Sequence, residues 1–148
     1  MPDNRHQAFV ERFADYWADP SPERMGEILT EDVTLIQPLS HPMEGLDAAQ
    51  EEFRRLFDWI PDLRAEVSHW GGHEDTLFIA FTLSGTLGLN TPLRWPLVDH
   101  FDLVDDKARR RVSYFDALPL LGTVLRTPSA WWSWWRSGIA RPWRRPGI

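Results

Sequence analysis

Residues 93–103 read Leu-Arg-Trp-Pro-Leu-Val-Asp-His-Phe-Asp-Leu and predict a β-strand with large apolar residues at every second position. Successive side chains of a strand point to opposite faces, so Asp99 shares a face with Trp95, Leu97, Phe101 and Leu103. A carboxylate in that setting must find partners or stay protonated, because an unpaired buried charge is costly. Asp99 is therefore the leading candidate for a catalytic acid or base. The alternative is a structural carboxylate that caps backbone or pairs with an arginine.

A second strand is predicted at residues 111–116, Arg-Val-Ser-Tyr-Phe-Asp. Its alternation places Val112, Tyr114 and Asp116 on one face, which we expect to be the interior. Asp116 is the second candidate catalytic residue, and its alternative role is to cap the turn that follows. Two acids directed into one apolar interior would suit proton transfer on a small molecule.

The remaining elements follow from apolar spacing and from helix-breaking residues. An aromatic stripe at three- and four-residue spacing indicates the first helix, and Ser21 followed by Pro22 begins a second. Helices are predicted at residues 5–17, 21–29 and 46–60, strands at 33–37, 63–70, 76–86, 93–103 and 111–116, and turns at 71–72, 88–92 and 105–106. Helices followed by strands predict an α+β domain in which a curved antiparallel sheet wraps the N-terminal helices.

The composition is that of one globular domain. The chain has 148 residues, of which 43% are hydrophobic and 26% charged. It contains no cysteine, which excludes disulfides, thiolate metal sites and a cysteine nucleophile. The first residues have no apolar signal-like run, so a cytoplasmic location is expected.

Charge and tryptophan are unevenly distributed along the chain. The net charge is −6, yet residues 126–148 hold five arginines and no acid, so this tail is +5 and the rest is −11. Such an acidic body disfavours nucleic acid as a partner. We therefore divide the chain into a domain at residues 1–125 and a Trp/Arg-rich tail at 126–148. The tail holds five of nine tryptophans and has three open interpretations: packing over the domain or a partner subunit, contact with a membrane surface, or binding of a protein partner.

Four stretches resemble the SnoaL-like branch of the nuclear transport factor 2-like (NTF2-like) superfamily. They are Leu-Thr-Glu-Asp-Val at 29–33, Gln-Pro at 37–38 through Gly45, Ile-Pro-Asp-Leu at 60–63, and Val-Asp-His-Phe at 98–101 followed by Tyr-Phe-Asp at 114–116. The resemblance spans about residues 8–120. It implies a cone-shaped α+β barrel around a mostly apolar pocket for a small hydrophobic molecule, and a homodimer formed through the sheet.

The resemblance implies several functions, because the superfamily includes polyketide cyclases, isomerases, dehydratases, limonene-type epoxide hydrolases and members without known catalysis. In the cyclases an aspartate on the last strands is the general acid and base, a position that Asp99 or Asp116 would fill. The epoxide-hydrolase pattern is incomplete, because Ser113 stands where its last-strand acid does, and Leu35 and Gln37 where its tyrosine and asparagine do. Both a cofactor-free enzyme and a non-catalytic binding module therefore remain open.

The candidate substrate-binding residues are those that could wall the pocket or orient a ligand or water. They are Gln37, Tyr114, Trp17, Trp95 and Ser113. No cofactor is expected, because the chain has no phosphate loop and no nucleotide-binding glycine motif. It also has no serine nucleophile elbow. No metal is expected either: His69 and His73 flank Gly71 and Gly72 as in a hairpin, with no further ligands to complete a site.

Overall fold

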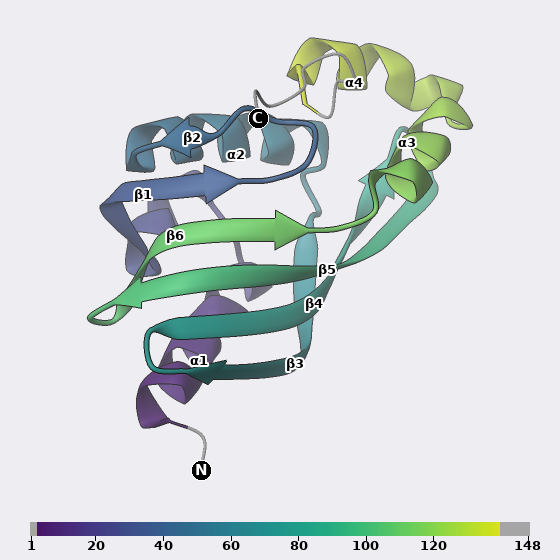
Figure 1. Cartoon of the computed structure of the whole chain (residues 1–148). Helices are drawn as coiled ribbons and strands as arrows, with labels where there is room; N and C mark the ends of the chain where they lie inside the picture. Colours follow the sequence, from purple (N-terminus) through teal and green to yellow (C-terminus); the bar gives the residue numbers. More distant parts are fainter. Residues whose placement is uncertain (1–2, 140–148) are drawn as a thin grey trace.

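The computed structural model describes residues 3–139, and six strands in it form one curved sheet in the order β2-β1-β6-β5-β4-β3 (Figure 1). The strands are β1 (Leu29–Ile36), β2 (Met43–Glu44), β3 (Arg64–His73), β4 (Thr76–Leu87), β5 (Thr91–Val104) and β6 (Lys107–Tyr114). The helices are α1 (Asn4–Ala18), α2 (Leu46–Trp59), α3 (Ala117–Leu125) and α4 (Trp131–Ser137), with 3-10 turns at Pro22–Glu27 and Pro128–Ala130. The predicted α+β class is confirmed. The sheet curves like a cone without closing, since β2 and β3 remain its two edges.

The first helix covers the inner face of the sheet because its aromatic stripe is buried there. Asp3 caps α1 by accepting a hydrogen bond from the backbone N–H of Arg5. The ring centroid of Phe13 lies 5.1 Å from that of Phe81 on β4 and 5.6 Å from that of Phe101 on β5. These edge-on contacts join the predicted helix to the predicted strands and form the centre of the core.

The β3–β4 turn lies further along the chain than predicted. We expected it at Gly71 and Gly72, but β3 continues through both residues to His73, and the turn is formed by Glu74 and Asp75. A Cβ at Gly72 would lie 2.3 Å from the carbonyl oxygen of Thr76 and 2.9 Å from the His6 ring. Glycine is therefore required here for close packing of α1 on the hairpin, and not for a turn.

A β-bulge in the β5–β6 hairpin decides which residues of β6 face inward. Val104 pairs with Lys107 and Leu103 with Ala108, but Asp102 pairs with Arg110, so Arg109 is the extra residue. One extra residue reverses the alternation of every residue that follows it.

The first strand is inserted beside the last one. Strand β1 pairs in parallel with β6, with Leu35 opposite Arg111, and β2 extends the sheet beyond β1. This arrangement carries the residues that follow β1, beginning with Gln37, to the end of β6 where the candidate site lies (Figure 1).

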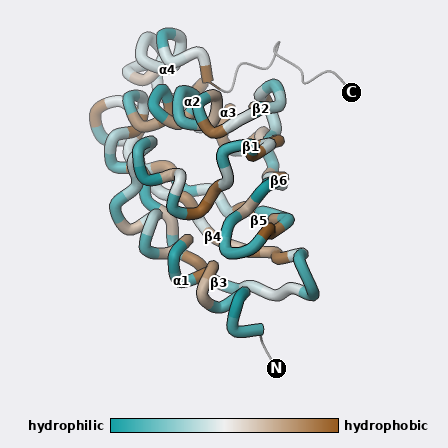
Figure 2. Tube along the Cα trace, turned by 90° about the vertical axis from the view of Figure 1, so that its left-hand side faces the viewer, coloured by the Kyte–Doolittle hydropathy of each residue, from teal (hydrophilic) through white to brown (hydrophobic). Residues whose placement is uncertain are grey.

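Residues 117–137 form two further helices at one end of the molecule, and α4, which belongs to the tail, packs on α2 (Figures 1 and 2). Ala130 and Ile139 are buried in the core and Trp134 packs against it. This agrees with the interpretation in which the tail packs over the domain, although most of its tryptophans do not take part. Trp143, Arg144 and Arg145 lie outside the described residues.

Candidate functional site

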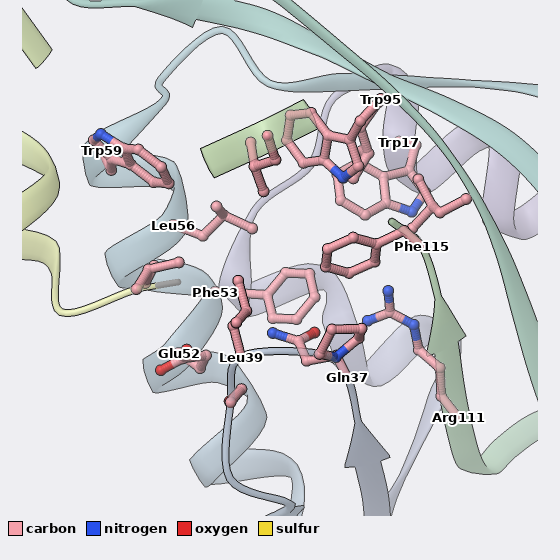
Figure 3. A pocket seen from close by; sticks show the side chains of 16 residues that line it. Trp17, Gln37, Leu39, Glu52, Phe53, Leu56, Trp59, Trp95, Arg111 and Phe115 are labelled. Atoms are coloured by element: carbon pink, nitrogen blue, oxygen red, sulfur yellow. The ribbon is translucent and has the colours of Figure 1, made fainter. Parts of the chain in front are cut away.

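The candidate site is a pocket on the inner side of the sheet, between α2, the loop after β1 and the end of β6. Its lining is mostly apolar, with few polar side chains (Figure 3). The lining residues are Trp17, Gln37, Pro38, Leu39, Ser40, Glu52, Phe53, Leu56, Trp59, Leu83, Trp95, Leu97, Arg111, Phe115, Leu120 and Ile139.

The pocket is narrow in this conformation. The free space between its side chains is about 60 Å³, whereas sites for drug-sized molecules hold about 300–1,000 Å³. Leu120 comes from α3 and Ile139 from the tail, so the tail forms part of the pocket wall. A larger ligand requires side-chain rearrangement or a displacement of the tail.

A buried charged pair lies behind one wall of the pocket. Arg111 donates a hydrogen bond from Nε to Oδ2 of Asp99 at 2.5 Å, and Ser113 donates from Oγ to Oδ1 at 2.6 Å. Asp99 is completely buried and the Arg111 side chain is 9% exposed. The register explains the cluster, because Ser113 lies directly opposite Asp99 and Arg111 opposite the neighbouring Phe101.

Burial raises the pKa of the Asp99 carboxyl above its ordinary value of 3.8, and the charge and hydrogen bonds of Arg111 and Ser113 oppose that rise. Tyr16 on α1 is also buried close to this cluster. Burial raises the pKa of its phenol, against the lowering influence of the Arg111 charge. The Tyr16 hydroxyl has no hydrogen-bond partner in residues 3–139.

Arg111 brings positive charge to the pocket surface. Figure 3 shows its guanidinium on the same side of the pocket as Gln37, with the rings of Trp17 and Trp95 beyond them. The guanidinium carbon lies 5.6 Å from the ring centroid of Phe53. Its bond to Asp99 is the single hydrogen bond that the guanidinium makes within residues 3–139, so other N–H donors remain available to a ligand.

The structure separates the predicted site residues into three groups. Gln37, Trp17 and Trp95 line the pocket. Asp99 and Ser113 lie behind it, enclosed and bound to each other.

The third group, Tyr114 and Asp116, was predicted to face the interior, and that prediction is wrong. Tyr114 is 56% exposed on the outer face of the sheet. Asp116 is exposed and accepts a hydrogen bond from the backbone N–H of Leu118, which caps α3. The physical reason is the extra residue at Arg109, which turns Arg111 and Ser113 inward in place of Val112 and Tyr114.

Arg111 is the functional candidate that the sequence interpretation missed. An arginine in the middle of a strand usually marks a solvent-facing position, and the apolar residues Val112 and Tyr114 indicated the opposite face. The available signal was the buried carboxylate itself, because an enclosed Asp99 requires a cationic or hydrogen-bonding partner nearby.

Residues 10–111, more than half of the chain, match the family described as the SnoaL-like domain. This chain belongs to that family. No curated protein matches the SnoaL-like domain described here. The family assignment and the curved sheet confirm the resemblance found in the sequence.

Solved structures share the fold of this SnoaL-like domain at low sequence identity. A protein from Jannaschia sp. CCS1, whose name places it among SnoaL-like polyketide cyclases, is 21% identical with a TM-score of 0.71, over 82% of this chain and 92% of that one. A protein from Catenulispora acidiphila DSM 44928 with a ketosteroid isomerase-like fold, in complex with trimethylamine, is 17% identical with a TM-score of 0.71, over 78% and 90%. TerC, co-crystallised with polyporic acid, is 17% identical with a TM-score of 0.72, over 83% and 99%.

Proposed function

We propose that this SnoaL-like domain binds a small hydrophobic molecule through an acidic or carbonyl oxygen and promotes cofactor-free proton transfer on it, as a cyclase, isomerase or dehydratase does. The observation that carries the proposal is the Arg111 guanidinium at the surface of a mostly apolar pocket, where it has N–H groups that donate to no group within residues 3–139. Such a cation stabilises negative charge that develops on a substrate oxygen, as in an enolate. The names of the cyclase and the isomerase-like structures agree with this chemistry.

Within this proposal Arg111 contacts the substrate oxygen, and Asp99 with Ser113 positions Arg111. Gln37 donates or accepts a second hydrogen bond, while Trp17 and Trp95 hold the apolar body of the ligand. Asp99 keeps its proposed role as acid or base only if Arg111 swings away from it on binding, because no ligand reaches an enclosed carboxylate otherwise.

Binding can be tested with β-naphthol and with naphthalene, which has no hydroxyl. We expect the wild type to bind β-naphthol more tightly than naphthalene. Arg111→Lys should keep more of this preference for β-naphthol than Arg111→Met does. Titration followed by tryptophan fluorescence measures both ligands, since three tryptophans line the pocket. Equal affinity of the wild type for both ligands would show that Arg111 does not bind the ligand oxygen.

Catalysis can be tested by exchange of the acidic α-hydrogens of β-tetralone in deuterium oxide, followed by proton NMR. The base removes an α-proton to give the enolate, and a deuteron from solvent replaces it. We expect catalysis by the wild type and a loss of roughly 100-fold in Arg111→Met. The pH–rate profiles of Asp99→Asn and Glu52→Gln then show which of these two carboxylates carries the proton, because Glu52 also lines the pocket.

The alternative is a non-catalytic binding module. It is favoured by the complete enclosure of Asp99, which leaves no proton-transfer group in the contact position that the cyclases use. β-Naphthol binding by a wild type that exchanges no β-tetralone hydrogens at any pH would support this alternative.

We further propose a homodimer through the outer face of the sheet. Phe78, Val98 and Tyr114 are large apolar residues on that face and are 45%, 38% and 56% exposed. Phe78 stacks on His100, with ring centroids 4.7 Å apart, which extends the face across β4 and β5. A second copy that covers these side chains would remove their apolar surface from water.

A further inference from the structure

The outer side of the tail carries a cluster of exposed tryptophans. Trp131, Trp132 and Trp135 on α4 are 48%, 70% and 53% exposed, and Leu125 at the end of α3 is 60% exposed. Together with Pro128 these residues line one shallow hollow in the surface. We call Leu125, Pro128, Trp131, Trp132 and Trp135 the tryptophan face.

The tryptophan face has a fixed shape because the other side of the same segment is anchored. Ala130 and Ile139 are buried and Trp134 packs against the core. The indole N–H of Trp131 donates to the carbonyl oxygen of Val124 at 3.0 Å, which holds that ring in place. The tail therefore presents large apolar rings to solvent although it has an interior side on which such rings could be buried.

Positive charge accompanies the tryptophan face. Arg126 follows α3 and Arg136 lies on α4, and both are exposed. Arg136 makes no ion pair within residues 3–139. The segment from Arg126 to Ile148 has five arginines and no acid, although the chain as a whole is negative.

We propose that the tryptophan face docks on an anionic lipid surface. Indole rings favour the boundary between water and the acyl chains, and arginines pair with anionic headgroups. None of the helices in residues 3–139 is long and apolar enough to cross a membrane, so the contact is a peripheral one. A second copy of the chain fits less well, because a twofold contact at this face would bring two arginine-rich tails together.

The experiment uses the full chain and two kinds of vesicle, one of phosphatidylcholine alone and one of phosphatidylcholine with an equal part of phosphatidylglycerol, at low salt. The test variant is Trp132→Ser with Trp135→Ser, and its matched control is Leu89→Ser, since Leu89 is 83% exposed in the β4–β5 turn. Arg136→Gln tests the charge, with the exposed Arg109→Gln as control. Circular dichroism verifies that each variant keeps its fold.

We expect the wild type to co-sediment with the anionic vesicles, with a blue shift of tryptophan emission, and to bind neutral vesicles more weakly. The double tryptophan variant should lose about tenfold or more in partition coefficient, and Arg136→Gln about fivefold. Both controls should bind as the wild type does. A wild type that stays in the supernatant overturns the proposal, as does equal weakening by Leu89→Ser. Self-association that the tryptophan variant abolishes, without vesicle binding, would assign the face to a second copy instead.

Discussion

Nε of Arg111 on β6 lies 2.5 Å from Oδ2 of Asp99 on the neighbouring strand β5, and both residues are buried. The pair joins the core to the pocket, because Asp99 is fully buried while Arg111 forms part of the pocket wall. A change in either residue should therefore be visible in stability as well as in ligand binding.

Arg111→Met leaves the Asp99 carboxylate buried with Ser113 as its remaining partner. We expect the free energy of unfolding near pH 7 to fall by about 3 kcal/mol, since breaking a buried ion pair leaves an uncompensated charge. Arg111 lowers the pKa of Asp99, so its loss raises that pKa further, and the folded variant takes up a proton at a higher pH than the unfolded chain does. The deficit should therefore shrink as the pH falls, which urea unfolding at several pH values measures.

The control for this prediction is the double variant Asp99→Asn with Arg111→Met, which removes both charges. We expect the double variant to lose less stability than the sum of the two single variants. Additive losses would mean that the two side chains do not stabilise each other.

Deleting Arg109 should remove the bulge and restore regular pairing of β5 with β6. Ser113 would still lie opposite Asp99 and Arg111 opposite Phe101, because only the unpaired residue is lost. We therefore expect the deletion variant to keep the buried Asp99–Arg111 pair and to lose about 1 kcal/mol or less.

The matched control is Arg109→Ala, which keeps the residue count, and thermal unfolding compares the two variants. Arg109 pairs with Asp32 where both side chains are exposed, so this substitution should cost less than about 1 kcal/mol. A loss of several kcal/mol in the deletion variant but not in the substitution would contradict the assignment of Arg109 as the extra residue.

Gly72→Ala should destabilise the protein because a Cβ there collides with the backbone oxygen of Thr76 and with the His6 ring. We expect a loss of about 1–3 kcal/mol, as for overpacking in a core. The neighbouring Gly71→Ala is the control, since a Cβ at Gly71 meets nothing within 4 Å. Denaturant unfolding measures the loss of stability in both variants. A larger loss in Gly71→Ala than in Gly72→Ala would show that α1 does not pack closely on the hairpin.

Asp62→Ala tests a carboxylate that joins the turn after α2 to the end of β4. Oδ1 of Asp62 accepts from the backbone N–H of Thr86 at 2.9 Å, and Oδ2 accepts from its hydroxyl at 2.7 Å. Burial alone would raise the pKa of Asp62, but the two Thr86 hydrogen bonds bring it below the ordinary value of 3.8. A lowered pKa contributes stability above 3.8 that is lost as the pH falls through the lowered value.

We therefore expect Asp62→Ala to cost up to about 1 kcal/mol near neutral pH, limited by solvent screening at this exposed site. The difference from the wild type should disappear in acid, as thermal unfolding against pH would show. Asp106→Ala serves as the control, because the exposed Asp106 side chain makes no hydrogen bond within residues 3–139. If the stability difference between Asp62→Ala and the wild type is the same at all pH values, the charge of Asp62 does not contribute to stability.

Tyr114→Glu tests the proposed dimer, because it places a charge on the outer face of the sheet. We expect sedimentation equilibrium to show a dimer for the wild type and a monomer for this variant. Leu118→Glu is the control, since Leu118 is 76% exposed on α3 rather than on the sheet. A wild type that sediments as a monomer at all concentrations would contradict the dimer.

The sequence predicted those parts of the fold that depend on local spacing. The aromatic stripe of α1 and the alternation of β5 are periodic signals, and both predicted the buried face. The interior face of β6 could not be predicted in this way, because it depends on a single extra residue in the hairpin.

Only part of the candidate site could be predicted, because the extra residue in the hairpin also decides which β6 side chains reach the pocket. Trp17, Gln37 and Trp95 line the pocket, but Arg111 was missed, and Tyr114 and Asp116 were placed on the wrong face. The sequence predicts a turn at Gly71 and Gly72 because it does not reveal that the His6 ring of α1 approaches Gly72.

The parallel pairing of β1 with β6 sets an order of events during synthesis. Strand β1 leaves the ribosome first but has no place in the sheet until β6, more than 70 residues later, has followed it. The hairpins of β3 to β6 can form from local contacts, whereas β1 can join β6 only after β6 has been made. Gln37 follows β1 and Arg111 lies on β6, so these two walls of the pocket meet only when the two strands pair.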